Sequence, residues 1–146
     1  MPTFSRSVDV DWSGTLTEGR GQVQAGTGAF TFPVTFPARV GEPQGQTSPE
    51  ELMAASHAAC YAMALNGTVA RKGGSIGRTH VTATVIADKG DAGIKLTTSR
   101  LHVVAEGLQG IDRAQFAEVA REAEGRCPIS NALRGTMQIE LETEVR

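Results

Sequence analysis

The chain has no excess of charge of either sign, since 14 Lys and Arg face 16 Asp and Glu in 146 residues. The basic residues are scattered, so the sequence lacks the clustered positive charge that binds nucleic acids or anionic membranes. It also lacks a run approaching the roughly 20 apolar residues that a membrane span needs. We therefore expect a soluble protein with no nucleic-acid partner and no membrane partner.

The first ten residues lack the apolar core of a secretory signal, and Arg6 and Asp9 interrupt them. This absence favours the cytoplasm. Cysteine is also scarce, with Cys60 and Cys127 as the two thiols. Cytoplasmic thiols are kept reduced, so a permanent structural disulfide is disfavoured. A free core cysteine, a metal ligand and a redox-active thiol all stay open.

The length and the 40% share of apolar residues suit one compact domain, placed here at residues 1–146. We find no internal repeat and no low-complexity tract. Alternation of polar and apolar residues predicts three early strands, at 4–12, 21–24 and 29–36. Pro33 and Pro37 put the third of these strands at a sheet edge or give it an irregular end.

A long helix is predicted to begin after Ser48. Ser48 is the expected N-cap and Pro49 the first helical residue, and Glu51 lies three residues after the cap, which is a capping-box pattern. The helix is expected to run to about Arg71 and to stop at Gly73-Gly74. It is rich in alanine, and small side chains let other backbones approach closely. We interpret it as a central helix packed on several sides.

The second half of the chain mixes strands and helices. Asp112 is the expected N-cap of a helix that ends near Gly125, and Cys127-Pro128 starts a short helix that ends near Arg134. Strands are predicted at 80–87, 93–107 and 137–145, with a turn at 90–93 between the first two. The predicted order is β-β-β-α-β-β-α-α-β, which combines antiparallel hairpins with helices and indicates an α+β fold class.

The two cysteines lie in different environments. Cys60 is inside the long helix among small apolar residues, where a buried and unreactive cysteine is the commoner outcome. Cys127 precedes Pro128 at a helix start, where unpaired N–H groups and the helix dipole favour a thiolate, although a simple cap fits equally well. Neither belongs to a Cys-x-x-Cys unit, and none of the three histidines has ligand spacing with them. We therefore predict no metal site and no cofactor.

Two segments of the chain resemble the motifs of one family. Residues 48–65 read Ser-Pro-Glu-Glu-Leu-Met-Ala-Ala-Ser-His-Ala-Ala-Cys-Tyr-Ala-Met-Ala-Leu. Residues 127–133 read Cys-Pro-Ile-Ser-Asn-Ala-Leu. Both resemble the signatures of the OsmC/Ohr family, the osmotically induced and organic hydroperoxide resistance proteins, and the OsmC-like branch in particular. Trp12-Ser13-Gly14 and the order of elements extend the resemblance over essentially the whole chain.

The resemblance implies a fold and a reaction. Two α+β chains would wrap around each other as a homodimer, with the reactive sites at the interface and the small-residue helix at the buried centre. A hydroperoxide would be the substrate, organic or hydrogen peroxide, and no haem would take part. Cys60 would correspond to the peroxide-attacking cysteine and Cys127 to the resolving one, which closes a disulfide. A dithiol or a lipoyl protein would be the reductant.

The resemblance also extends to two charged positions. Glu50 matches the acidic residue of the family's Pro-Glu motif. The family takes an arginine from the loop before the long helix or from the early hairpin. Arg39 fits the OsmC-like branch, and Arg20 is the candidate for the Ohr-like branch.

The chemistry explains why a cation is needed at Cys60. Only a thiolate attacks an O–O bond efficiently, and about 3% of an ordinary cysteine is ionised at pH 7. Burial in a helix disfavours the thiolate further. An arginine ~4 Å from the sulfur supplies roughly 4 kcal/mol at an effective dielectric near 20, enough for nearly full ionisation. Arg39 is the candidate, with Glu50 holding its guanidinium in a planar pair; the alternative for Glu50 is an acid that serves the helix dipole.

Two other functions stay open from the sequence. A redox sensor would use the same cysteines stoichiometrically, and a carrier would bind an apolar ligand in the interface pocket. Met53, Tyr61 and Met63 lie at helical spacing and either line such a pocket or belong to the core, which is the commoner outcome. The sequence does not select the preferred peroxide.

Overall fold

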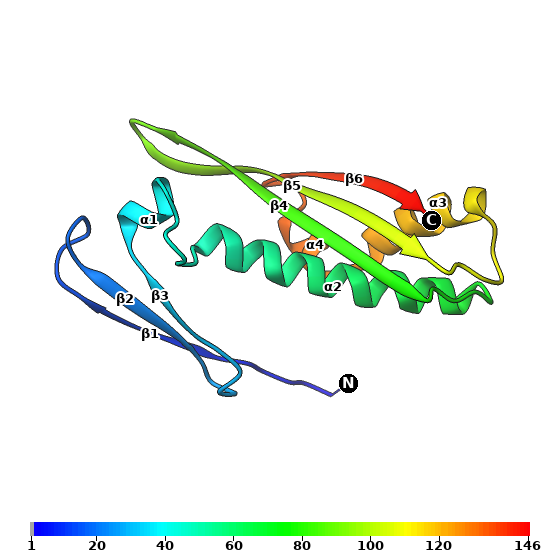
Figure 1. Cartoon of the computed structure of the whole chain (residues 1–146), viewed down its shortest axis with the longest axis horizontal. Helices are drawn as coiled ribbons and strands as arrows, with labels where there is room; N and C mark the ends of the chain where they lie inside the picture. The colour runs from blue at the N-terminus through cyan, green and yellow to red at the C-terminus, as the bar shows by residue number, and fades with distance from the viewer. Residues whose placement is uncertain (1) are drawn as a thin grey trace. The chain divides into compact units, whose positions relative to one another are not determined.

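The computed structural model describes residues 2–146 and confirms the α+β class. The chain divides into two compact units, Met1–Leu52 and Met53–Arg146, so the single domain over 1–146 stays a prediction. The elements follow in the order β1 (Val8–Ser13), β2 (Arg20–Ala25), β3 (Thr31–Val34), α1 (Phe36–Val40), α2 (Pro49–Arg71), β4 (Arg78–Gly90), β5 (Gly93–Glu106), α3 (Arg113–Arg126), α4 (Pro128–Leu133) and β6 (Gln138–Val145) (Figure 1).

The first unit contains an antiparallel sheet in the order β1-β2-β3. The central strand, β2, alternates exposed and buried residues and buries Val23 and Ala25, as period two predicts for a sheet covered on one face. β1 begins at Val8 and not at Phe4, because Val8 pairs with Ala25, the last residue of β2. Beyond this pair the Gly26 N–H donates to the Ser7 carbonyl at 2.8 Å, where the chain leaves β2 for the turn.

The segment after β3 corrects the predicted third strand. That strand was expected to reach Phe36, but it ends at Val34, and residues 36–40 form helix α1. Thr35 caps the helix, because its hydroxyl accepts a hydrogen bond from the Ala38 N–H at 3.3 Å. Pro37 is tolerated in the first helical turn, where its missing N–H costs nothing. Pro33 lies in an edge strand, as predicted.

The long helix α2 has the predicted ends, Pro49 and Arg71. The Glu51 N–H donates to Ser48 Oγ at 3.1 Å, which confirms the N-cap. The Glu51 carboxylate accepts a hydrogen bond from the Thr47 hydroxyl at 2.8 Å, so this carboxylate bonds the residue that precedes the N-cap. Gly73 adopts a φ of +84°, and the Gly74 N–H bonds back to the Val69 carbonyl, which stops the helix.

Within the second unit, helix α2 is buried along one stripe, and its packing on several sides stays a prediction. The buried residues recur at helical spacing: His57, Tyr61, Leu65, Thr68 and Val69. The opposite face is exposed in the chain and consists mainly of small or apolar residues: Ala55, Ala59, Met63, Asn66, Gly67 and Ala70.

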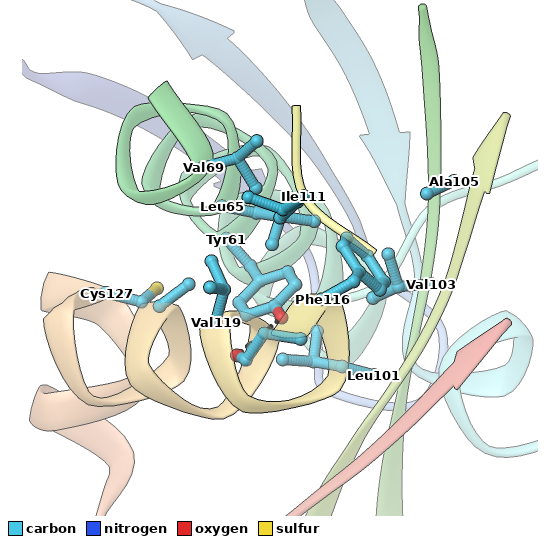
Figure 2. Close-up of a cluster of buried hydrophobic side chains, with 12 residues drawn as sticks. Tyr61, Leu65, Val69, Leu101, Val103, Ala105, Ile111, Phe116, Val119 and Cys127 are labelled. Atoms are coloured by element: carbon cyan, nitrogen blue, oxygen red, sulfur yellow. Dashed lines mark hydrogen bonds between the residues drawn. The ribbon is translucent and has the colours of Figure 1, made fainter. Parts of the chain in front are cut away.

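The second unit packs α2 and α3 on the sheet β4-β5-β6. β4 and β5 form a long hairpin whose turn lies between Gly90 and Gly93, as predicted. β6 pairs with β5 in parallel, which the sequence did not predict. Asp112 caps α3 in a complete capping box with Gln115. Figure 2 shows the core between these elements, with side chains from α2 (Tyr61, Leu65, Val69), β5 (Leu101, Val103, Ala105), α3 (Phe116, Val119) and the flanking Ile111 and Cys127.

Within residues 2–146, no helix is both long enough and apolar enough to span a bilayer. The cytoplasmic location stays a prediction.

Candidate active site

The second unit brings Cys60 of α2 next to Cys127, although 67 residues separate them in the sequence. Both are free thiols; Cys127 is fully buried and Cys60 is partly exposed. The thiol of Cys60 interacts with the thiol of Cys127 and with the backbone N–H of Ile129 in α4. Cys60 also packs against the core cluster that contains Cys127.

Cys127 lies at the junction of two helices, where it is both the C-cap of α3 and the N-cap of α4. Its Sγ accepts a hydrogen bond from the Ser130 N–H at 3.5 Å, and Pro128 fills the first turn. The predicted start of the short helix is therefore confirmed. Figure 2 places the Cys127 side chain at the end of the core cluster, between α3 and α4.

The environment of Cys60 disfavours its thiolate. Burial raises the pKa of the Cys60 thiol, the Ile129 N–H opposes this, and the interaction with Cys127 raises the pKa further. Among the described residues of the second unit, no cation lowers it. A nucleophilic Cys60 therefore needs a positive charge close to its sulfur.

Cys60 opens into a groove of about 510 Å³ along α2. Met63 lines this groove and is 76% exposed, whereas Tyr61 belongs to the core, where its hydroxyl donates to the Ala120 carbonyl at 2.8 Å. Met63 thus fits the pocket interpretation of the sequence, and Tyr61 fits the core interpretation. The groove is lined by Cys60, Met63, Ala64, Gly67, Thr68, Arg71, Arg126 and Pro128.

In the first unit, Arg39 of α1 and Glu50 of α2 form a planar ion pair. Arg39 Nε donates to both carboxylate oxygens of Glu50, at 3.0 and 3.1 Å, and Nη2 donates to Oε1 at 2.6 Å. Burial acts to raise the pKa of Glu50, but the hydrogen bonds and charge of Arg39 outweigh it and lower that pKa. The structure thus joins Arg39 and Glu50, while Arg20 is exposed at the start of β2.

Arg39 also lines a largely apolar cavity of about 360 Å³ in the first unit. This cavity was not predicted from the sequence, although Val8, Val10 and Trp12 alternate along β1 and share one face. Its polar groups come from Thr35, Arg39 and Thr47. Its apolar walls come from Val8, Val10, Trp12, Leu16, Val23, Val34, Phe36, Pro49 and Leu52.

A buried histidine near Cys60 was missed by the sequence analysis. His57 is fully buried, and its Nδ1 and Nε2 lie 2.6 Å from Ser99 Oγ and 2.7 Å from Ser130 Oγ. Burial lowers the pKa of His57, with Glu124 acting in the opposite direction. The signal that the sequence offered was a polar residue four positions before Tyr61, on the same stripe of the helix. Residues 2–146 contain no group of three or more His, Cys, Asp or Glu arranged for a metal ion.

The sequence profile of the OsmC-like protein family matches residues 41–142. The chain belongs to this family. Among its OsmC-like relatives, peroxiredoxin OsmC of Escherichia coli (strain K12) is 32% identical over 139 residues, which are 94% of this chain and 96% of the relative. The organic hydroperoxide resistance protein OhrB of Bacillus subtilis (strain 168) is 28% identical over 123 residues, 84% and 88% of the two chains.

The fold of the OsmC/Ohr family is confirmed by solved structures. An organic hydroperoxide resistance protein from Elizabethkingia anophelis superposes with a TM-score of 0.78, at 27% identity and with 100% of each chain covered. Glu50, Cys60 and Cys127 all lie within the segment that matches the OsmC-like profile, and Arg39 lies just before it. The family resemblance predicted from the two motifs is thus confirmed.

Proposed function

We propose that this chain is a thiol peroxidase that reduces hydroperoxides, with Cys60 as the nucleophile and Cys127 as the resolving thiol. The observation that supports it best is the meeting of these two free thiols, one partly exposed and one buried, at the start of α4. The names of its relatives, a peroxiredoxin and organic hydroperoxide resistance proteins, agree with this chemistry.

The proposed cycle has three steps. The Cys60 thiolate attacks the outer peroxide oxygen, the O–O bond breaks, and the leaving alkoxide takes a proton to become an alcohol. Cys60 is now a sulfenic acid. The Cys127 thiolate attacks that sulfur, the S–S bond forms, and the hydroxyl leaves with a proton as water. An external dithiol, for which a lipoyl protein is the proposed source, then reduces the disulfide by exchange.

The cation in this proposal is Arg39. Because burial raises the pKa of Cys60, a guanidinium at the sulfur is what makes a thiolate available near neutral pH. Glu50 would fix the plane of that guanidinium through Nε and Nη2. Among the hydrogen bonds of residues 2–146, none uses Nη1 of Arg39, and we assign this group to a peroxide oxygen.

We propose an organic hydroperoxide as the preferred substrate. The cavity beside Arg39 is apolar on most of its surface, and such walls favour an alkyl or aryl group over water-like hydrogen peroxide. The same cavity would also suit a carrier of apolar ligands. A double Cys60→Ser, Cys127→Ser variant separates the two, because a carrier keeps its ligand affinity and a peroxidase loses all turnover.

The cysteine roles are tested by peroxide consumption with cumene hydroperoxide and excess dihydrolipoamide. We expect Cys60→Ser to abolish turnover, because no other thiol is exposed to the groove, and Cys127→Ser to allow about one turnover per chain before the sulfenic acid accumulates. Ser56→Ala, at an exposed position of the same helix, is the matched control. Equal turnover by the wild type and Cys60→Ser would contradict the proposal, and stoichiometric consumption by the wild type would indicate a sensor.

A further inference from the structure

His57 takes no part in the peroxidase cycle proposed above, yet it precedes Cys60 by three residues on α2. Its ring is fully buried and meets Ser99 of β5 on one side and Ser130 of α4 on the other, and both serines are fully buried as well. A neutral imidazole has one donor and one acceptor nitrogen, so one serine donates to the ring and the other accepts from it. The ring therefore bonds three elements of the second unit together.

One of these bonds leads to the thiol pair. Ser130 carries the N–H that donates to Cys127 Sγ at 3.5 Å. The neighbouring Ile129 N–H interacts with the sulfur of Cys60. The backbone around both sulfurs is thus held by the Ser130 side chain, and through it by His57, on the helix that also carries Cys60.

We propose that His57 is a positioning residue for disulfide formation, which through Ser130 holds α4 and Cys127 in line with Cys60. The inference rests on the peroxidase function proposed above. In the affected step, Cys127 supplies the electron pair of the new S–S bond, the S–O bond of the sulfenic acid breaks, and the hydroxyl leaves as water. Misplacing a reacting atom by about 1 Å can cost on the order of 10²-fold in rate. Attack of Cys60 on the peroxide does not involve Cys127, so His57 acts on the second step.

The neutral state of the ring suits this role. Burial lowers the pKa of His57, while Glu124 of α3 works against this effect. A neutral ring satisfies both serines, whereas an apolar side chain would leave two buried hydroxyls without that partner, which is destabilising. Stability alone would therefore fall in any such variant, and the test must use a quantity that does not depend on the folded fraction.

That quantity is the share of oxidised protein that becomes over-oxidised at Cys60 and not disulfide-bonded. Reduced full-length protein is mixed with increasing cumene hydroperoxide without reductant, and intact mass spectrometry measures both products. We expect Ser130→Ala and His57→Leu to raise the over-oxidised share about tenfold while Cys60 is oxidised at its normal rate. His57→Gln, whose amide keeps a donor and an acceptor, should restore part of the disulfide yield.

Ser99→Ala is the matched control, since it removes the hydroxyl at the other end of the same ring and leaves the link to α4. An unchanged over-oxidised share in Ser130→Ala and His57→Leu, or equal increases in Ser130→Ala and Ser99→Ala, would overturn the inference. Disulfide closure with diamide, which needs no peroxidase chemistry, should be slowed in the same order of variants. A wild type that closes with diamide but ignores peroxide would instead refute the proposed function.

Discussion

Arg39 and Glu50 hold each other in a pair that is shielded from water on several sides, with side chains 29% and 15% exposed. Three hydrogen bonds fix the plane of the guanidinium, which a single exposed ion pair does not do. Cys60, by contrast, is a thiol whose pKa is raised by burial. At the scale of residues, the proposed reactivity of Cys60 therefore depends on whether the oriented guanidinium of Arg39 acts on its thiol.

We expect Arg39→Ala to lower the rate of Cys60 oxidation by about 100-fold or more, because an oriented donor and a charge are both lost. Arg39→Lys keeps the charge but not the planar pair, so its loss should be smaller yet clear. The rate is measured by loss of free thiol in a single turnover at pH 7. Arg20→Ala serves as the comparison, and a loss of activity in Arg20→Ala with a fully active Arg39→Ala would reverse the assignment.

At the scale of elements, α3 and α4 are joined by a single residue, Cys127, which ends one helix and caps the other. The position of the resolving thiol therefore depends on both helices. The start of α3 is held by the capping box, in which the Gln115 N–H donates to Asp112 at 2.8 Å and the Asp112 N–H donates to Gln115 at 2.9 Å. Its buried face, with Phe116 and Ala120, packs on α2 and the sheet.

Removing the Asp112 cap should lower the stability of the fold and leave the proposed peroxidase reaction unchanged. We expect Asp112→Ala to lower the free energy of unfolding by about 1 kcal/mol, because orphan N–H groups of the first turn lose an acceptor. Urea denaturation of the reduced protein measures the change. Asp112→Ser keeps a capping oxygen and should stay close to the wild type, so an equal loss in both variants would show that the cap is not the cause.

At the scale of the whole molecule, the single chain leaves apolar surface exposed in both units. The small-residue face of α2 is open in the second unit, and Val8, Val10 and Trp12 of β1 are 53%, 57% and 42% exposed in the first. Exposed apolar groups gathered on one element are typical of an association surface. They support the homodimer that the family resemblance implies, which we retain as a proposal.

A charge on the open face of α2 tests that proposal. We expect wild-type protein to run as a dimer in size-exclusion chromatography with light scattering, and Ala59→Glu to shift it toward the monomer, because a carboxylate would be buried without a partner. Ala92→Glu, in the exposed β4–β5 turn, makes the same change away from this face and should leave the dimer intact. A monomeric wild type, or an Ala59→Glu variant that is as dimeric as the control, would refute it.

The features that could be predicted from residue patterns are mostly local. The ends of α2 at Pro49 and Arg71, the Asp112 cap and the Gly90–Gly93 turn depend on residues within a few positions of each other, so they could be predicted. The order of the predicted strands and helices indicated the α+β class. The family resemblance added the proposed pairing of Cys60 with Cys127, because its two motifs are distinctive in sequence even though they lie far apart.

The features that depend on distant segments became visible in the folded chain alone. The parallel pairing of β5 with β6, the one-sided burial of α2, the apolar cavity at Arg39 and the bridge from His57 to Ser99 and Ser130 join residues tens of positions apart. A local sequence pattern cannot predict such a contact. The free energy of the contact comes from burial and from hydrogen bonds that exist only after the elements have packed. In the sequence, His57 cannot be distinguished from any other helical histidine, because β5 and α4 bring its serine partners to it only when the chain folds.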